Sequence, residues 1–409
     1  MITSHQPDAL ERELRHGIDV VRGALIDLYA DVGADPATPQ TVSRSLGINR
    51  NLAWKLSRVI VAEEPLDSIE HLPRPAAVEI LLEAFERAGA ASSVRARLRA
   101  AVSDFDAVID DAIGDRSLLE LIVGPMLPPH RQAERDQAAR KLAFRGNSAI
   151  WGIQAAVRLS SMFMAPNPED PDMVDVATVG GLIGYRRLRS GVSWPLLRVH
   201  GYEGDGSSID AVNLPLDPAI APGDPPLMPA FCTADQPAII TRAIPGGQQF
   251  DLGPGPLGNR GLTTSIFGVR TPRFASCWGD EANAYGEQLM SWSTPVEHAV
   301  VDLIVHRDLP FDLPPTLRVA GRMTPGQADP VTARETAALP LAEAVRPLGS
   351  GPARFVTPLV PDYPAMTDAV FTTMQWDPEA FAAWRVTVAF PPIPTVATLR
   401  FGLGRRSTP

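Results

Sequence analysis

Three polar side chains at helical spacing have the chemistry to read DNA. Asn51, Lys55 and Arg58 recur at i, i+4 and i+7, so they share one face of a helix. Asparagine can bind adenine and arginine can bind guanine bidentately, whereas lysine offers charge to a base or a phosphate. Arg50 lies near the expected start of the same helix, where recognition helices usually meet bases. We therefore predict that this face contacts double-stranded DNA.

Two short helices joined by a tight turn are expected to position this face. Gly47 lies where the first helix must end, small Ser43 precedes it by one turn, and Ile48 follows as a core residue. The second helix carries its apolar residues on another side, at Leu52, Leu56, Val59 and Ile60. Residues 36–62 contain no acidic residue and four basic ones, which are Arg44, Arg50, Lys55 and Arg58.

Residues 38–60 resemble the helix-turn-helix units of bacterial transcription regulators, and the resemblance covers about residues 20–60. The resemblance implies that Gln40 and Arg44 contact backbone phosphates. It also implies that four side chains of the second helix face the major groove, namely Arg50, Asn51, Lys55 and Arg58. In winged-helix families a basic hairpin follows the second helix. Here Glu63, Glu64 and Pro65 follow it instead, so no wing is expected. Trp54 is expected to pack at the edge of the core. The alternative is an ordinary helical hairpin with a solvated basic face.

A second cluster, His298, Asp302 and His306, has residue types that bind transition metals. Residues 294–297 have the pattern of a capped helix start, although a strand would also place the three side chains on one face. On a helix, the i, i+8 pair of histidines would lie about 12 Å apart, too far for one ion. A histidine hydrogen-bonded to a neighbouring aspartate is the favoured interpretation, and we expect no metal and no other cofactor.

Two further patterns have weaker chemical content. Gly253 to Gly258 matches G-x-G-x-x-G by letters, but residues 262–267 after it have the composition of a strand rather than the helix that a pyrophosphate site needs, so a turn is expected. Arg186, Arg187 and Arg189 form a basic cluster near a predicted strand end, either a solvated turn or an extension of a phosphate-contacting surface. We find no P-loop, G-x-S-x-G or H-E-x-x-H signature and expect no enzyme.

The first third of the chain has helical periodicity. Helices are predicted at residues 8–29, with a break at 33–36, and at residues 75–88, 92–112 and 130–144, the last ending at Gly146. The apolar stripe of residues 92–112 needs a partner, either its own domain or a second subunit, and is our candidate for dimerisation.

Beyond Gly146 the chain becomes rich in β-branched and aromatic residues. Strands are predicted at residues 150–164, 174–188, 194–202, 238–250, 262–269 and 384–401. The predicted fold class is α+β, with an all-α helix-turn-helix domain (1–64), a helical connector (65–146) and a β-rich domain (147–409).

Composition narrows the function classes. The net charge of −10 argues against a surface coated with nucleic acid throughout, but not against a local basic face. Two cysteines, no signal-like start and no long apolar run lead us to expect a cytoplasmic protein without membrane segments. The leading hypothesis is a homodimeric, or otherwise homo-oligomeric, DNA-binding regulator whose β-rich domain senses a small-molecule effector or mediates assembly. The alternative is a self-assembling structural protein with a helical adaptor.

Overall fold

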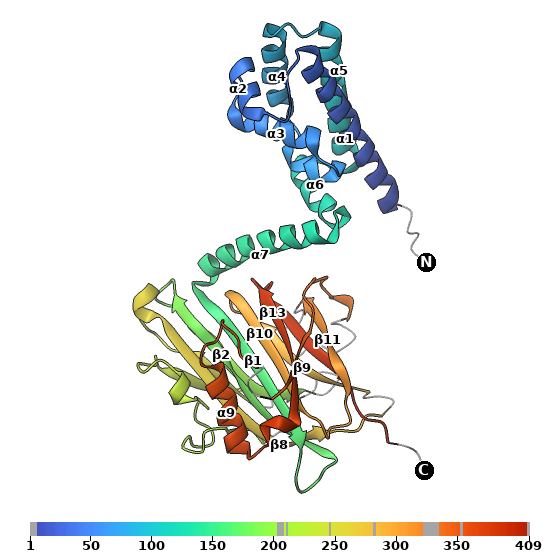
Figure 1. Ribbon diagram of the computed structural model, residues 1–409. Helices are drawn as coiled ribbons and strands as arrows, with labels where there is room; N and C mark the ends of the chain where they lie inside the picture. The colour runs from blue at the N-terminus through green and yellow to red at the C-terminus, as the bar shows by residue number, and fades with distance from the viewer. Residues whose placement is uncertain are drawn as a thin grey trace. The chain divides into compact units, whose positions relative to one another are not determined.

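The computed structural model describes residues 6–202, 208–209, 212–244, 247–280, 284–321, 335–351 and 355–406 (Figure 1). The chain divides into two compact units, Met1–Asp136 and Gln137–Pro409. Among the described residues, the first unit is helical and every strand belongs to the second. The predicted mixed α+β class is therefore confirmed.

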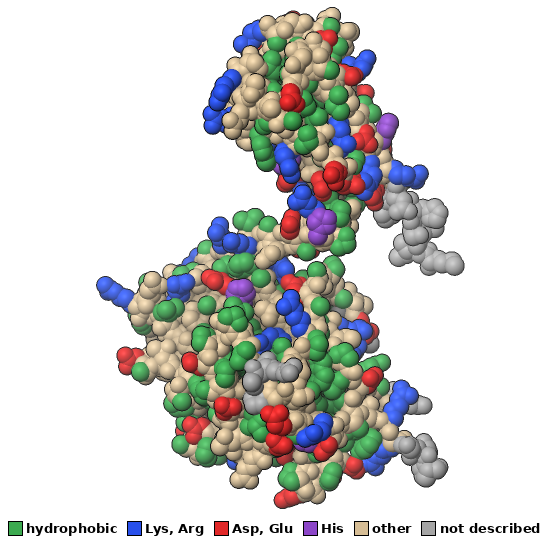
Figure 2. Space-filling model, in the orientation of Figure 1, with side chains coloured by type: hydrophobic (Ala, Val, Ile, Leu, Met, Phe, Trp, Pro, Cys, Tyr) green, Lys and Arg blue, Asp and Glu red, His purple; other side chains and the backbone are tan. Residues whose placement is uncertain are grey.

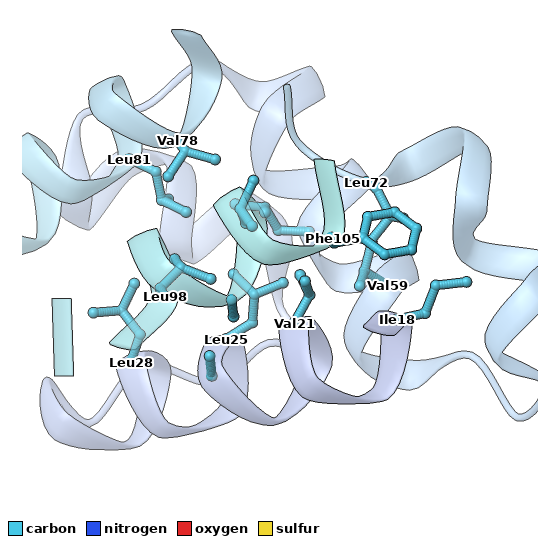
Figure 3. Close-up of a cluster of buried hydrophobic side chains, with 14 of the residues drawn as sticks. Ile18, Val21, Leu25, Leu28, Val59, Leu72, Val78, Leu81, Leu98 and Phe105 are labelled. Carbon is cyan, nitrogen blue, oxygen red and sulfur yellow. The ribbon is translucent and has the colours of Figure 1, made fainter. Parts of the chain in front are cut away.

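The N-terminal unit is built from seven helices of the described chain and two short 3-10 helices. They are α1 (Gln6–Asp31), α2 (Pro39–Leu46), α3 (Arg50–Val61), η1 (Pro65–His71), α4 (Pro75–Arg87), α5 (Ser92–Ala112), α6 (Arg116–Val123), η2 (Gly124–Met126) and the first residues of α7 (Pro129–Trp151). One apolar face of each long helix meets in a single core, in which Leu25 of α1, Val59 of α3, Leu81 of α4 and Phe105 of α5 lie together (Figure 3). The α1–α5 approach is close enough that a Cβ at Gly17 would lie 2.5 Å from the Phe105 ring.

The predicted boundary at residue 64 does not separate two units. Helices on both sides of it share the same core, because Leu66 and Ile69 of η1 are buried with the residues of α1 and α3. The apolar stripe of α5 is also covered within this unit: Leu98 is 0% and Phe105 2% exposed. Of the two partners considered for that stripe, its own domain is the one found, so the stripe is not free for a second subunit.

The helix predicted to end at Gly146 continues to Trp151. Glycine costs only about 1 kcal/mol in a helix interior, so it need not end a helix. Gly152 comes directly after the helix instead, and it has the left-handed φ of 70° that commonly follows a helix C-terminus. The prediction that a glycine ends this helix is therefore right, but the glycine is Gly152 and not Gly146.

A seven-stranded sheet forms the centre of the C-terminal unit, with the order β12-β13-β10-β1-β2-β8-β5. Its strands are β1 (Ile153–Pro166), β2 (Met173–Arg187), β5 (Leu214–Pro215), β8 (Thr263–Ser276), β10 (Val296–His306), β12 (Arg346–Ser350) and β13 (Phe381–Ala389). Neighbouring strands are antiparallel except β1 and β10, which pair in parallel from Ala155 opposite Val296 to Met164 opposite Val305.

Three smaller elements cover this sheet. Helix α9 (Tyr363–Met374) packs on one face through Tyr363 and Phe371. The other face packs against a three-stranded sheet in the order β11 (Asp312–Gly321), β14 (Thr395–Gly402) and β9 (Tyr285–Trp292). A four-stranded sheet, β4 (Ser208–Ile209), β3 (Trp194–Tyr202), β7 (Gly247–Leu252) and β6 (Ile239–Ile244), shares a small core with the start of β1 and the end of β2. Single 3-10 turns lie at η3 (Pro229–Phe231), η4 (Gly258–Gly261) and η6 (Pro378–Ala380).

Candidate nucleic-acid interface

The turn between α2 and α3 is fixed by local hydrogen bonds. Gly47 follows α2 with a left-handed φ of 67°, a conformation that glycine adopts without strain. The Asn49 side chain then caps α3 by accepting a hydrogen bond from the backbone amide of Asn51 at 2.8 Å. The Ser43 hydroxyl donates to the carbonyl of Ile48 at 2.8 Å, which ties the end of α2 to the start of the turn. Three local features, at Ser43, Gly47 and Asn49, therefore fix the turn between the two helices.

The inner side of these two helices belongs to the core of the unit. Val42, Leu46 and Ile48 are 2–7% exposed, and Leu56 and Val59 are fully buried. Of the predicted buried residues on α3, Leu52 and Ile60 are only half-buried. Because the inner face is fixed in this way, the opposite face of α3 must point to solvent.

The residues predicted to contact DNA lie on this outward side. Five of the six are exposed and Lys55 is half-buried; the exposed ones are Gln40, Arg44, Arg50, Asn51 and Arg58. Lys and Arg side chains are visible at the edge of the unit over α2 (Figure 2). Within the described part of the chain, none of the four cations forms an ion pair with a carboxylate. Positive charge on this face is thus uncompensated.

Most other arginines of the same unit do have such partners. Arg116 binds Asp106 at 2.6 Å, Arg99 binds Glu79 at 2.7 Å, and Arg95 binds Glu86 at 2.8 Å. Arg15 lies between Glu11 and Glu64. The outward face of α2 and α3, which we call the α3 face (Gln40, Arg44, Arg50, Asn51, Lys55 and Arg58), therefore differs from its surroundings in charge balance.

Trp54 lies on the exposed side of α3, one turn from both Arg50 and Arg58. Its side chain is 46% exposed, and its ring meets His71 edge-on with 5.1 Å between ring centroids. The expected packing at the edge of the core thus accounts for only part of the indole. Burial lowers the pKa of His71, and the charges of Arg58 and Lys55 lower it further against the opposing effect of Glu70. His71 is consequently neutral at neutral pH and adds no charge to the face.

A 3-10 helix, not a hairpin, follows α3. Helix α3 ends at Val61, and η1 begins at Pro65 with the side chain of Glu64 accepting from the amide of Leu66. Glu64 also pairs with Arg15 of α1, which ties the segment to the core helix.

The cluster His298, Asp302 and His306 lies on β10, so the helix start suggested by residues 294–297 is wrong. The strand pairs with β1 on one side and β13 on the other, and this sheet context overrides the local capping pattern. Residues four apart in a strand are separated by about 13 Å, so the three side chains do not converge. The described residues contain no group of three His, Cys, Asp or Glu placed to hold a metal.

Asp302 has a different role, in a buried ion pair. Its side chain is 0% exposed and accepts from Arg385 Nε at 2.7 Å and from a second Arg385 nitrogen at 2.6 Å. The Tyr363 hydroxyl of α9 donates to the same carboxylate at 2.6 Å and also meets the Ser161 hydroxyl at 2.8 Å. Burial and the negative charge of Asp302 raise the pKa of Tyr363 well above its usual range. The network joins β1, β10, β13 and α9.

The glycine-rich segment packs against the side chain of Arg187. Residues 253–257 lie between β7 and η4, Gly258 begins η4, and strand β8 follows, as expected for a turn. Arg187 donates to the carbonyl of Gly253, and a Cβ at Gly255 would lie 2.5 Å from an Arg187 nitrogen. Gly255 therefore leaves room for a buried guanidinium.

One open groove of about 590 Å³ lies in the N-terminal unit between α4 and α5. Val78 and Val102 form part of its apolar lining, and Glu79, Asp106 and Asp110 supply acidic groups at its edges. No residue of the α3 face lines this groove.

Comparison with known proteins found no matching family model, no matching curated protein and no matching solved structure. Among the described helices, none combines the length and the apolar character needed to cross a lipid bilayer.

Proposed function

We propose that the chain is a sequence-specific DNA-binding regulator, in which α2, the turn and α3 act as a helix-turn-helix. One observation carries the proposal: a capped helix presents Arg50, Asn51, Lys55 and Arg58 outward with no carboxylate partner among the described residues. An unpaired cation on a rigid helix loses little on binding a phosphate or a guanine edge, because no ion pair has to be broken first. Gln40 and Arg44 would contact the backbone on either side.

The test is selection of bound duplexes from a random DNA library, followed by fluorescence anisotropy on the selected site. Arg50→Ala, Asn51→Ala and Arg58→Ala should each weaken binding by about 1–3 kcal/mol, mostly on the selected site, because they remove base contacts. Arg44→Ala should weaken binding to all sequences and lower the salt dependence by about one counterion.

Arg74→Ala and Arg87→Ala are matched controls, since both arginines are exposed, have no carboxylate partner among the described residues and belong to α4 and its N-cap instead of α2 or α3. Both controls should bind like the wild type. Failure to select any sequence, or equal effects of control and α3-face variants, would contradict the proposal.

The remaining parts of the proposal are a cytoplasmic location, a homo-oligomeric state and an effector or assembly role for the C-terminal unit. Two half-sites on DNA would double the contact area for a dimer. Cys232 and Cys277 are both free thiols, which accords with a reducing compartment.

A second candidate function, self-assembly with the helical unit as an adaptor, is favoured by one observation. Helix α6 is apolar on its outside as well as its inside, with Leu118 44% and Leu121 73% exposed. Light scattering with and without DNA separates the two functions. A large assembly that ignores DNA and dissociates on Leu121→Glu would favour self-assembly.

A further inference from the structure

A second surface with uncompensated positive charge lies at one end of the C-terminal sheet. Strands β1, β2 and β8 are antiparallel neighbours, so the start of β1, the end of β2 and the start of β8 meet at the same end. The chain beside these ends supplies Trp151, Arg186, Leu188, Arg189, Leu257 and Arg260, which we call the basic end. Lys and Arg side chains are visible at the upper left of this unit, near η4 (Figures 1 and 2).

Backbone contacts bring these residues together. The amides of Leu188 and Arg189 both donate to the carbonyl of Gly152, at 2.7 and 3.3 Å. Arg187 forms an isolated bridge with Leu257, and Arg186 donates to the Asn259 side chain at 2.7 Å beside Arg260. Backbone hydrogen bonds and one side-chain hydrogen bond therefore hold the three segments side by side.

Acidic residues are missing from every segment that builds the basic end. Residues 137–168, 176–202 and 252–279 contain no Asp or Glu, in a chain whose net charge is −10. Arg186, Arg189 and Arg260 have no ion pair among the described residues, whereas Arg140, Arg273 and Arg400 elsewhere in the unit bind Glu343, Asp170 and Glu287.

Arg187 is buried beneath the basic end and adds a positive charge there. It is 2% exposed and donates to the carbonyls of Val192 and Gly253, so backbone dipoles solvate its charge and no carboxylate of the described residues neutralises it. Field lines from a buried, unpaired cation extend to the surface above it, because the low-dielectric interior screens them weakly.

Apolar side chains interrupt the arginines. Trp151 is 49%, Leu188 41% and Leu257 46% exposed. The Trp151 ring is held by an edge contact with Trp194, with 5.7 Å between ring centroids. The backbone of a duplex presents mainly phosphates, whereas a single strand offers phosphates to guanidinium groups and also unstacked bases to an indole.

We propose that the basic end is a binding surface for single-stranded nucleic acid, with Arg186, Arg189 and Arg260 on phosphates and Trp151 against a base. The surface is distinct from the α3 face in residues and in unit, and the proposal does not depend on the DNA-binding role of that face.

The test uses the full chain and a labelled single-stranded oligonucleotide of mixed sequence. Arg186→Gln, Arg189→Gln and Arg260→Gln combined should weaken binding roughly ten- to a hundredfold and lower the log–log salt slope by about 2, as expected for three lost phosphate contacts on a single strand. Trp151→Ala should weaken binding by roughly fivefold or more with an unchanged salt slope, since stacking releases no counterions. Trp151→Phe should retain most of the affinity.

The matched control combines Arg270→Gln, Arg307→Gln and Arg346→Gln, which removes the same charge from exposed arginines elsewhere in the unit. The control should bind like the wild type, and unchanged circular dichroism should exclude unfolding in both triple variants. Equal losses in the two triple variants would overturn the proposal, as would losses confined to a duplex or to vesicles of acidic phospholipid.

Repeating the measurements in an Arg50→Ala, Lys55→Ala, Arg58→Ala background separates this surface from the α3 face. The effect of the basic-end variants should persist there. If α3-face variants leave duplex binding untouched while basic-end variants abolish single-strand binding, the regulator proposal fails and this one stands.

Discussion

At the scale of residues, arginines of this chain differ in whether a carboxylate lies beside them. Arg116 and Arg385 each bind an aspartate and contribute to the fold. Arg50 and Arg58 have no such partner in the described chain and stay available. Residue type and spacing could predict the second pair but not the first, because the partners of Arg116 and Arg385 are placed by tertiary structure.

Under the proposed DNA-binding function, Trp54 should determine part of the sequence preference of the α3 face. An exposed indole between two arginines fits the methyl group of thymine, an apolar contact available in the major groove. Replacing the contacted thymine by uracil removes one methyl and should cost wild-type binding about 0.8 kcal/mol. Anisotropy on a series of uracil-substituted selected sites measures this cost at each position.

In Trp54→Ala the same uracil substitution should cost nothing, because the two changes remove one contact. A thymine-to-uracil cost that is the same in both proteins at every position would show that the indole does not read the base.

Asp302→Asn should destabilise the C-terminal unit strongly. The substitution keeps the size of the side chain but leaves the Arg385 guanidinium buried without a counter-charge, a change that typically costs about 3–5 kcal/mol. Urea unfolding followed by tryptophan fluorescence measures the loss. The signal reports mainly on the C-terminal unit, because Trp54 is the only tryptophan of residues 1–136 and the other six lie beyond them.

The control for this measurement is Asp308→Asn, whose side chain is 70% exposed near His306 and should change stability little. A loss below about 1 kcal/mol for Asp302→Asn would mean that the buried pair is not what holds β10, β13 and α9 together.

At the scale of elements, the helices were easier to predict than the strands. The stretches 75–88 and 92–112 match α4 and α5 within one residue, because each carries a regular apolar stripe between clear breaks. The predicted strands 238–250 and 384–401 each contain two strands instead of one, since β-rich composition does not locate a hairpin turn. Helix α9, with its many β-branched residues, and strands β9, β11 and β12 gave no signal that periodicity could detect.

The candidate interface was predictable to the extent that it is local. Capping, the turn glycine and the outward spacing on α3 are all encoded within residues 38–60. The basic end was visible only as the cluster at Arg186, because its other members come from segments about 35 and 70 residues away that strand pairing brings together.

The turn glycine offers a prediction for this element. Gly47→Ala should lower the stability of the N-terminal unit by about 1–2 kcal/mol, because the residue has a φ of 67° that alanine adopts only with strain. No atom lies within 4 Å of the added Cβ, so backbone strain is the only cost. Thermal unfolding followed by far-ultraviolet circular dichroism measures it.

Gly23→Ala is the counterpart within the same unit, since Gly23 lies inside α1 with nothing within 4 Å of an added Cβ. It should stabilise the unit by about 0.5–1 kcal/mol. Shifts of the same sign in both variants would contradict the role assigned to the turn.

At the scale of the whole molecule, charge is distributed unevenly along a chain that is acidic overall. The two surfaces without carboxylate partners, the α3 face and the basic end, lie in different units and draw on segments free of Asp and Glu. Net charge therefore says little about which partners this chain can bind, and local charge balance says more.

The parallel pairing of β1 with β10 has a consequence for how the chain is made. Some 140 residues separate Ala155 from Val296, its partner in the register, which at about 5–20 residues per second corresponds to roughly 7–28 s of synthesis. During that interval the N-terminal unit is complete and free to fold on the ribosome. The central strand meanwhile has an unpaired, apolar edge on the nascent chain, a state that is prone to aggregation until β10 is made.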